Sequence, residues 1–427
     1  MLRKSIVMLV ICGLLLGTGV ILAKDQVKLT ATFAAPKDRW DMLMEVAEEI
    51  INERHPDMDI EISYEVLPYA QARSKLITMT AGETPRDLVS VDQIWLGEFA
   101  KAGYLKDITF EVAKWGRIDE FYPKNVEGCI YDGRFYGLWS WTDVRVLWYW
   151  KDLLNEAGVE PEDLTTWDGY IEAYEKLKPV TLSKGIQPIH LVGAGHSPDM
   201  WFPYLWMSGG DILELRKDQY GTEKYFPVFD SDAGVKALGF LQDQVGAGIK
   251  PQIDHYWGAE FADKKFAVML EGSWLLGKFP DDFDFSKIGM VPLFPTPEED
   301  MTSSTMMGGW ILAVPSTSEH PELAWELLTI LEDPDVLTPM LAEFGYLPTQ
   351  KTIAEDPEYA SVLEESIPFF SELTKALPIG HGRPNIPQYP TIAENIRMAI
   401  EEVYYGRKDP EAALEDAAEK SKSVLGW

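Results

Sequence analysis

The chain of 427 residues is 46% hydrophobic and 25% charged, so it is neither disordered nor fibrous and has room for two or three packed cores. Its 69 Asp and Glu against 38 Lys and Arg give a formal charge of −31, which opposes broad contact with nucleic acid or anionic lipid. The only cysteines in the sequence are Cys12 and Cys129, which excludes a disulfide scaffold.

The N-terminus has the pattern of an export signal. Arg3 and Lys4 precede an uncharged, largely apolar run over residues 5–22, and Ala23 stands before the first polar residues. This order predicts a signal peptide over residues 1–23, and therefore a protein of the periplasm or of the outer face of the cell membrane. An uncleaved anchor stays open, because about 18 apolar residues is the lower limit for crossing a bilayer.

Strands and helices then alternate along the chain. Apolar residues at every second position predict a strand over 27–33, and helical spacing of apolar residues follows over 40–51. Period two returns over 60–66, a helix follows over about 70–82, and 87–91 has the apolar run of a buried strand. The order β-α-β-α-β predicts a right-handed parallel sheet.

Ligands of such sheets bind beyond the carboxyl ends of the strands, and Asp92 directly follows the predicted strand 87–91. Its carboxylate is a candidate acceptor for a ligand hydroxyl. The alternative is a purely local role, in which Asp92 caps a helix that begins at Gln93.

A new α/β unit begins after the aromatic segment 136–150. Thr165 and Asp168 have the spacing of a capping box and predict a helix start. Further on, Trp274 follows an apolar strand at 266–270 and Trp310 precedes the apolar run 311–315, which places both rings at strand–loop junctions.

Five fragments of the sequence, taken together in their order along the chain, carry a resemblance to a known family. They are SVDQIWLGEF at 90–99, YGLW at 136–139 with Tyr149 after it, EGSW at 271–274, GGW at 308–310 and GYLPT at 345–349. This series resembles the sugar-binding family of extracellular solute-binding proteins that serve ABC importers. The resemblance runs from about Val27 to the C-terminal helix.

The resemblance implies an α/β periplasmic-binding-protein fold, similar to type II, with two discontinuous lobes. Three hinge crossings are then expected near 139–144, 288–295 and 328–334. The N-terminal lobe would comprise 24–141 and 293–332, and the C-terminal lobe 142–292 and 333–427.

A sugar offers hydroxyls that donate and accept hydrogen bonds, and one ring face made of C–H groups. Carboxylates accept from hydroxyls in charge-assisted hydrogen bonds, and indole rings cover the C–H face. The sequence has 15 Trp, more than a core alone usually needs, and several stand beside carboxylates at turns. Carbohydrate is therefore the ligand class that the residues favour.

The resemblance implies ligand contacts at the first crossing and at two later tryptophans. Asp143 with its neighbour Trp141 matches aromatic-x-Asp positions that touch sugar in related proteins, and Trp139 is the next aromatic candidate. Trp274 and Trp310 match stacking positions. Packing between lobes is the alternative for Trp139, and core packing for Trp274 and Trp310.

Further candidates lie later in the chain or on its surface. Asp199 and Trp201 belong to one loop of the C-terminal lobe, where Asp199 is alternatively a solvated turn residue. Arg383 and Tyr389 flank a segment that resembles the family's last cleft loop, and an Arg fork suits a carboxylate or two hydroxyls. The remaining candidates are Arg73 and Glu271, whose alternative is simple solvation.

Enzymatic function has little support in the sequence. A secreted glycoside hydrolase needs two carboxylates at a set separation, which sequence spacing cannot supply. The motifs G-x-S-x-G, H-E-x-x-H and G-x-x-x-x-G-K-[ST] are missing, and His190 and His196 are too far apart to share a helix face.

We therefore expect a binding protein without catalytic residues, metal or cofactor. It would capture a carbohydrate by closure of two lobes and deliver it to a membrane permease, as a monomer and without nucleic acid. A hydrolase and a binding protein for a polyamine or a peptide stay open.

Overall fold

The computed structural model describes residues 24–34, 36–81, 84–193, 198–252, 258–280, 282–292, 294–298 and 301–427. The expected signal peptide at 1–23 and His196 lie outside these ranges. Within them, no helix is both long enough and apolar enough to cross a membrane.

The first five elements confirm the predicted order of strands and helices. They are β1 (Asp25–Ala34), α1 (Asp38–Arg54), β2 (Met58–Leu67), α2 (Tyr69–Ala81) and β3 (Leu88–Asp92). Strand β1 pairs in parallel with β2 on one side and with β3 on the other. Leu29, Ala31 and Phe33 alternate into the core, which is the period-two pattern of the sequence.

The main sheet has eleven strands, eight of which follow the order β10-β7-β11-β6-β13-β3-β1-β2. The short strands β12 and β14 pair with β6, and β15 pairs with β13. Their bounds are β6 Leu138–Trp150, β7 Gln187–Val192, β10 Pro251–Gln252, β11 Phe266–Gly272, β12 Ile288–Val291, β13 Thr305–Ala313, β14 Leu347–Pro348 and β15 Gly380–His381.

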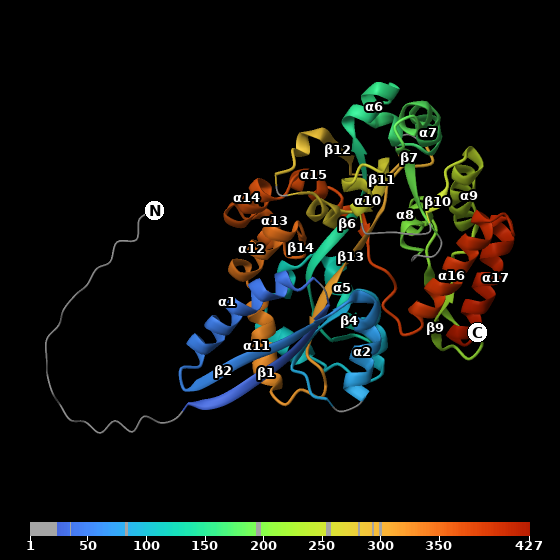
Figure 1. Cartoon of the computed structure of the whole chain (residues 1–427). Helices are drawn as coiled ribbons and strands as arrows, with labels where there is room; N and C mark the ends of the chain where they lie inside the picture. Colours follow the sequence, from blue (N-terminus) through green and yellow to red (C-terminus); the bar gives the residue numbers. More distant parts are fainter. Residues whose placement is uncertain are drawn as a thin grey trace, which may run out of the picture.

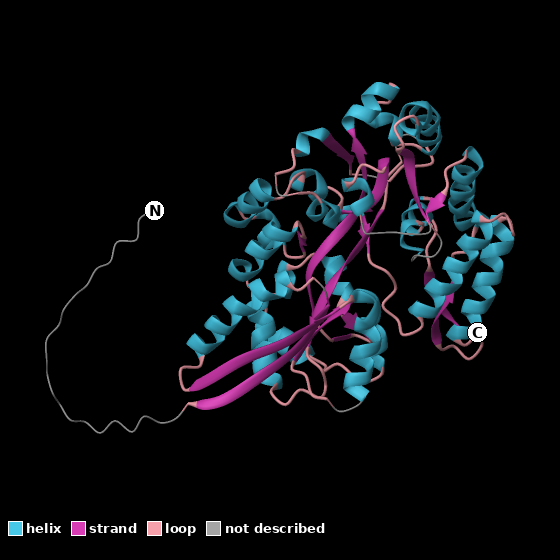
Figure 2. Cartoon of the chain, viewed as in Figure 1, coloured by secondary structure: helices cyan, strands magenta, loops and turns pink. Residues whose placement is uncertain are grey.

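Strand β6 runs through both halves of the molecule, together with β13, as Figures 1 and 2 show. All thirteen of its residues are buried. Residues up to Val144 pair with β13, and residues from Arg145 onward pair with β11, with β12 bonded to the last part of the strand. The change of partner falls beside the expected crossing at 139–144, while the exact bounds of the lobes remain a prediction.

Helices cover both halves of this sheet (Figure 2). On the side of β1 and β2 they include α3 (Leu96–Lys101), α4 (Thr109–Trp115), α5 (Pro123–Gly128), α11 (Pro321–Leu331) and α12 (Pro334–Phe344). Helix α12 packs against α1, although it follows residue 332, where the sequence-based division ends the first lobe. Next to α12 in the chain come α13 (Lys351–Glu355), α14 (Pro357–Ser366) and α15 (Phe370–Thr374).

The other half carries α6 (Lys151–Ala157), α7 (Trp167–Leu182), α8 (Phe202–Met207), α9 (Asp232–Ala247), α10 (Ala259–Ala262), α16 (Tyr389–Tyr404) and α17 (Pro410–Leu425). Two small hairpins are β4 (Ile130–Tyr131) with β5 (Arg134–Phe135), and β8 (Leu213–Lys217) with β9 (Glu223–Pro227). Short 3₁₀ helices are η1 (Gln93–Trp95), η2 (Ile118–Glu120), η3 (Pro161–Leu164), η4 (Pro198–Met200), η5 (Ser273–Lys278), η6 (Phe285–Lys287) and η7 (Leu377–Ile379).

Two local expectations were wrong. Thr166, not Thr165, caps α7: its hydroxyl accepts from the Gly169 N–H at 3.2 Å, while Thr165 ends the preceding turn η3, where its hydroxyl donates to the Glu162 carbonyl at 2.7 Å. Trp310 lies inside β13 and not at a junction, because the strand starts at Thr305 and continues through the two glycines before Trp310.

Candidate ligand-binding site

Charged and phenolic side chains from both halves meet near the middle of the sheet. We call them the central cluster, and they come from α2, the end of β3, β6, η4, the loop before α16 and the first residue of α16. Its members are Tyr69, Asp92, Asp143, Arg145, Asp199, Arg383 and Tyr389.

Arg383 joins two carboxylates that are far apart in the chain. Its Nη2 lies 3.3 Å from Asp92 Oδ1, and its Nη1 lies 3.1 Å from Asp199 Oδ2. The three side chains are only 6, 11 and 14% exposed, in the order Arg383, Asp92, Asp199. Burial lowers the pKa of Arg383, but Asp199 and Asp92 outweigh it and the net pKa is raised. The guanidinium is therefore a permanent cation held between two anions.

Asp92 has the local capping role that its sequence position allows, and its role as a ligand acceptor stays a prediction. Oδ1 accepts from the Ile94 N–H at 3.3 Å and so caps η1, while Oδ2 accepts from the Tyr69 hydroxyl at 2.9 Å. A local capping bond thus fixes the carboxylate at the strand end, with its other contacts directed into the central cluster.

Asp199 and Tyr389 each keep one buried polar atom without a hydrogen-bond partner among the described residues. These atoms are Asp199 Oδ1 and the Tyr389 hydroxyl oxygen. Burial, and next the Asp199 carboxylate, raise the pKa of Tyr389, so its hydroxyl stays protonated. The cluster therefore offers a buried acceptor and a buried hydroxyl group that the described residues leave without a partner.

A second charged pair lies on β6. Asp143 and Arg145 form an ion pair, and the Arg145 guanidinium stacks over the Trp274 ring with 4.5 Å to its centroid. Burial lowers the pKa of Arg145 to about 10, so it remains charged at neutral pH. Gly308 faces this pair across the sheet: a Cβ there would come within 2.8 Å of Arg145 Nη1.

An aromatic wall adjoins Tyr69. The half-buried Trp310 meets the edges of Tyr69 and Trp95, each at 6.0 Å between centroids. Behind it, the Arg39 guanidinium lies 5.6 Å from the Trp310 ring centroid and 4.9 Å from that of Trp141. These rings give the site an apolar surface beside its charged groups.

The loop before α16 contacts the half of the molecule that carries β1 and β3. Asn385 Nδ2 donates to the carbonyls of Gly128 and Ile130 at 3.2 and 2.9 Å, and Gln93 Nε2 donates to the Arg383 carbonyl at 2.9 Å. Gly97 allows a close approach here, because a Cβ would lie 2.6 Å from the Asn385 carbonyl oxygen.

The other sequence candidates take different places. Trp139 is fully buried in the core and donates its indole N–H to the Trp141 carbonyl at 2.9 Å. Trp201 is 1% exposed in the interior of the other half. Glu271 is fully buried at the end of β11, where Oε1 accepts from the Gly272 N–H. Arg73 forms a forked ion pair with Glu98, with closest contact 2.6 Å.

Of the twelve candidates, the structure brings Asp92, Asp143, Asp199, Arg383 and Tyr389 into the central cluster, with Trp274, Trp310 and Trp141 in the adjoining aromatic contacts. Sequence reasoning missed Tyr69 and Arg145. The signal for Arg145 was its lone positive charge between apolar residues of a buried strand, since such a charge requires a partner.

The arrangement suits recognition of an uncharged molecule that both donates and accepts hydrogen bonds. Its two arginines are already paired with carboxylates, and apolar ring surface lies next to them. In the described part of the chain, no three His, Cys, Asp or Glu side chains are grouped in a way that would hold a metal ion.

Known proteins share this architecture. The chain is 26% identical over 342 residues to the arabinooligosaccharide-binding protein of Bacillus subtilis (strain 168). This match covers 75% of each of the two chains. It also resembles the solute-binding protein of an ABC transporter from Thermotoga lettingae TMO, solved with α-D-tagatose (26% identity, TM-score 0.77, 95% of this chain and all of the other). Maltose-bound T. maritima MalE3 is 26% identical to this chain with a TM-score of 0.76, and the match covers 93% of this chain and 100% of the other.

These likenesses confirm the expected α/β, two-lobe fold of binding proteins. A family model described as bacterial extracellular solute-binding protein matches residues 48–363, which is most of the chain. Both the family and the similar structures are binding proteins. The chain therefore belongs to the bacterial extracellular solute-binding proteins.

Proposed function

We propose that this protein binds an uncharged carbohydrate at the central cluster, between its two lobes, and delivers it to the permease of an ABC importer. The observation that carries the proposal is the unmatched pair of buried atoms, Asp199 Oδ1 and the Tyr389 hydroxyl. A sugar hydroxyl donates and accepts, so ligand hydroxyls can satisfy both. The relatives named above bind arabinooligosaccharides, tagatose and maltose, which supports the same ligand class here.

The charges of the cluster favour an uncharged ligand. Three aspartates stand against two arginines, so an acidic sugar meets an excess of negative charge. A polyamine would have to compete with Arg145 and Arg383, which already neutralise most of that charge. Trp310 and Trp274 supply the surface for the C–H face of a pyranose or furanose ring.

Closure is the proposed mechanism. Asp92 and Asp199 lie on different halves, and the loop of Arg383 and Asn385 reaches across to α3 and α5. A ligand that contacts both halves favours the arrangement in which they meet, because those contacts exist only there. Ligands that lack a matching hydroxyl leave buried polar atoms unpaired, which gives selectivity.

The rest of the proposal concerns location and partners. The N-terminal segment 1–23 would direct export, the protein would act as a monomer outside the cytoplasm, and it would bind neither nucleic acid nor a cofactor. No bond is made or broken: the product handed to the permease is the ligand itself.

The test is a thermal-shift screen of the purified protein with mono-, di- and oligosaccharides, followed by calorimetry of the strongest hits. A ligand at 100 times its Kd adds about 2.7 kcal/mol of apparent stability. We expect neutral sugars to raise the unfolding temperature, and uronic acids, spermidine and short peptides to leave it unchanged. A response to spermidine or peptides alone would refute the ligand class, and release of new reducing ends would refute pure binding.

A further inference from the structure

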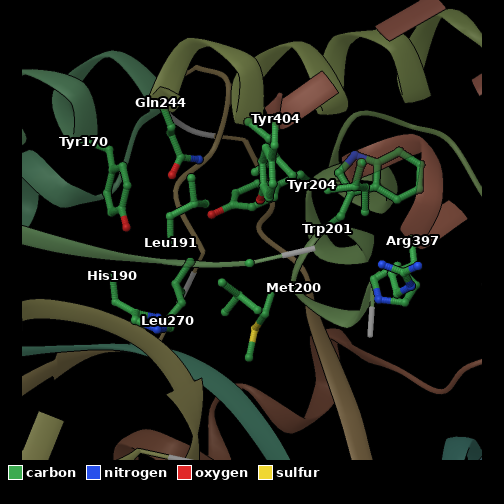
Figure 3. A pocket seen from close by; sticks show the side chains of 15 residues that line it. Tyr170, His190, Leu191, Met200, Trp201, Tyr204, Gln244, Leu270, Arg397 and Tyr404 are labelled. Carbon is green, nitrogen blue, oxygen red and sulfur yellow. The ribbon is translucent and has the colours of Figure 1, made fainter. Parts of the chain in front are cut away.

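A cavity lies inside the C-terminal half, apart from the central cluster. It is lined by residues of α7, β7, η4, α8, α9, β11 and α16, and Figure 3 shows the side chains that surround it. The cavity leaves about 30 Å³ for the centres of water molecules. One water needs about 10–15 Å³ on this measure, so the space suits about two waters and is too small for a sugar.

Three buried polar atoms on its lining have no hydrogen-bond partner among the described residues: the Tyr170 hydroxyl oxygen, Gln244 Nε2 and Trp201 Nε1. The three residues are 0, 2 and 1% exposed. Figure 3 shows the hydroxyl of Tyr170 and the amide of Gln244 turned toward the same space. Gln244 Nε2 and Trp201 Nε1 can only donate, so the cavity calls for an occupant with acceptor oxygens.

The charge around the cavity argues against an anion as that occupant. Arg397 lies on the lining, but it is paired with Glu394 at 2.7 Å and with Glu401 at 3.0 Å. Burial raises the pKa of Tyr170, Tyr204 and Tyr404, so these phenols are neutral. An anion would therefore enter a site without free positive charge, whereas water accepts two hydrogen bonds and remains neutral.

The cavity is also joined to the central cluster through one short segment. Pro198, Met200 and Trp201 line the cavity, and Asp199 between them holds Arg383. Whatever fixes Trp201 from inside thus fixes the turn η4 that carries Asp199.

We propose that this cavity is a hydration site, in which ordered water accepts hydrogen bonds from Gln244 and Trp201, bonds to Tyr170, and holds η4 in place. This water is a structural part of the half that presents Asp199, and the inference does not depend on the nature of the ligand.

The test compares Tyr170→Phe and Gln244→Met with wild type. Both changes keep the size of the side chain: Tyr170→Phe removes only the unpaired hydroxyl, and Gln244→Met removes the whole amide, including the unpaired Nε2. If water occupies the site, each variant takes a hydrogen-bond partner away from that water, and the unfolding temperature falls by roughly 1–3 °C. If the cavity is dry, each variant removes an unpaired polar group and the unfolding temperature rises or stays the same, which overturns the proposal.

Tyr405→Phe is the matched control, because Tyr405 is 58% exposed and lies next to Tyr404 at the end of α16. Its unfolding temperature should equal that of wild type. Two measurements on the folded protein complete the test. Amide exchange in the segment 198–207 should speed up in Tyr170→Phe but not in the control, and equal rates would contradict the link to η4. A high-resolution crystal structure should show water within hydrogen-bond distance of Tyr170, and an empty or otherwise filled cavity would refute the hydration site.

Discussion

Asp92 and Asp199 lie on opposite halves of the molecule and share one counter-ion, the guanidinium of Arg383, at 3.3 and 3.1 Å. Neither carboxylate is positioned by its neighbours in sequence alone. Asp92 stands at the end of β3, and Asp199 lies in η4 beyond β7, so the pair can be this close only when the halves meet. This relationship makes Arg383 the most informative residue to change.

Arg383→Met should weaken binding of the best sugar from the screen by about 100-fold or more, because a buried charged partner is worth about 2–5 kcal/mol when removed alone. The variant leaves Asp92 and Asp199 facing each other without a cation. Calorimetric titration measures the loss. Arg216→Met, on the exposed hairpin β8–β9, is the control and should bind the sugar as wild type does. An unchanged Kd for Arg383→Met would show that Arg383 takes no part in ligand binding.

Gly97→Ala should weaken the contact between the loop 382–388 and α3. The new methyl group would come within 2.6 Å of the Asn385 carbonyl oxygen, which is backbone and cannot simply rotate away. We expect about tenfold weaker sugar binding with little loss of unfolding temperature, since the strain is relieved by separating the two surfaces. Small-angle scattering should show a larger radius of gyration with ligand than in wild type.

The control for Gly97→Ala is Gly239→Ala on α9, where a Cβ has no heavy atom within 4 Å. That change should leave affinity unaltered. Equal affinity of Gly97→Ala and wild type would mean that the close approach at α3 has no part in ligand capture.

Glu332 should make stability depend on pH. Its carboxylate is fully buried near the expected third crossing, where Ser140 on β6 donates to Oε1 and Gln350 Nε2 lies 3.3 Å from Oε2. Burial raises its pKa to about 7 against 4.5 for an ordinary Glu, and the hydrogen bonds from Ser140 and Gln350, together with the nearby cation of Arg117, only partly oppose this. Between these two values the native state holds a proton that the unfolded state has lost.

The Glu332 contribution is therefore complete below about pH 4.5 and is lost as the pH rises through about 7. Glu332→Gln mimics the protonated form, so its unfolding free energy relative to wild type should rise by on the order of 3 kcal/mol from pH 5 to pH 8.5. Denaturant titrations at both pH values measure this. Glu415→Gln, exposed on α17, should show a constant difference, and a constant difference for Glu332→Gln would exclude the effect.

Gly309→Ala should be strongly destabilising. Gly309 has φ +143°, and a Cβ there would lie 2.2 Å from the Trp141 carbonyl oxygen and 2.3 Å from the Trp139 indole nitrogen. We expect a loss of about 3 kcal/mol or more, measured as the unfolding midpoint. Gly246→Ala, inside α9 with open space around its Cβ, should instead be neutral or stabilise by up to about 1 kcal/mol. Similar midpoints for both variants would show that β13 tolerates a side chain at position 309.

Periodicity predicted the first half of the sheet but not the centre. The strands at 27–33, 60–66 and 87–91 match β1, β2 and β3: the first two were predicted from apolar residues at every second position, and the third from a short run that is buried throughout. Strand β13 was predicted too short, since Gly308 and Gly309 have the composition of a turn. Their actual role is steric: they allow β13 to pass close to Arg145 and Trp141, and such a tertiary contact has no signature in the local sequence.

The sequence allowed the residues of the candidate site to be predicted from their types, but not which of them contact one another. Asp92, Asp199 and Arg383 stood out as polar residues at strand ends and loops. Their union depends on three segments separated by more than a hundred residues, which only the fold brings together. Tyr69 was missed because one tyrosine at the start of a helix looks like any other surface aromatic.

The path of β6 has a consequence for how the chain assembles. Residues 138–150 supply a central strand to both halves, and their partner β13 is made more than 150 residues later. During synthesis, the N-terminal sheet cannot be completed until residue 313 is available, so early collapse leaves β3 and β6 with open edges. Such non-local pairing slows folding, and a nascent chain stays extended longer than its first hundred residues would suggest. For the same reason, neither half cut out at residue 144 should fold alone, whereas fragments that share the intact β6–β13 pair should.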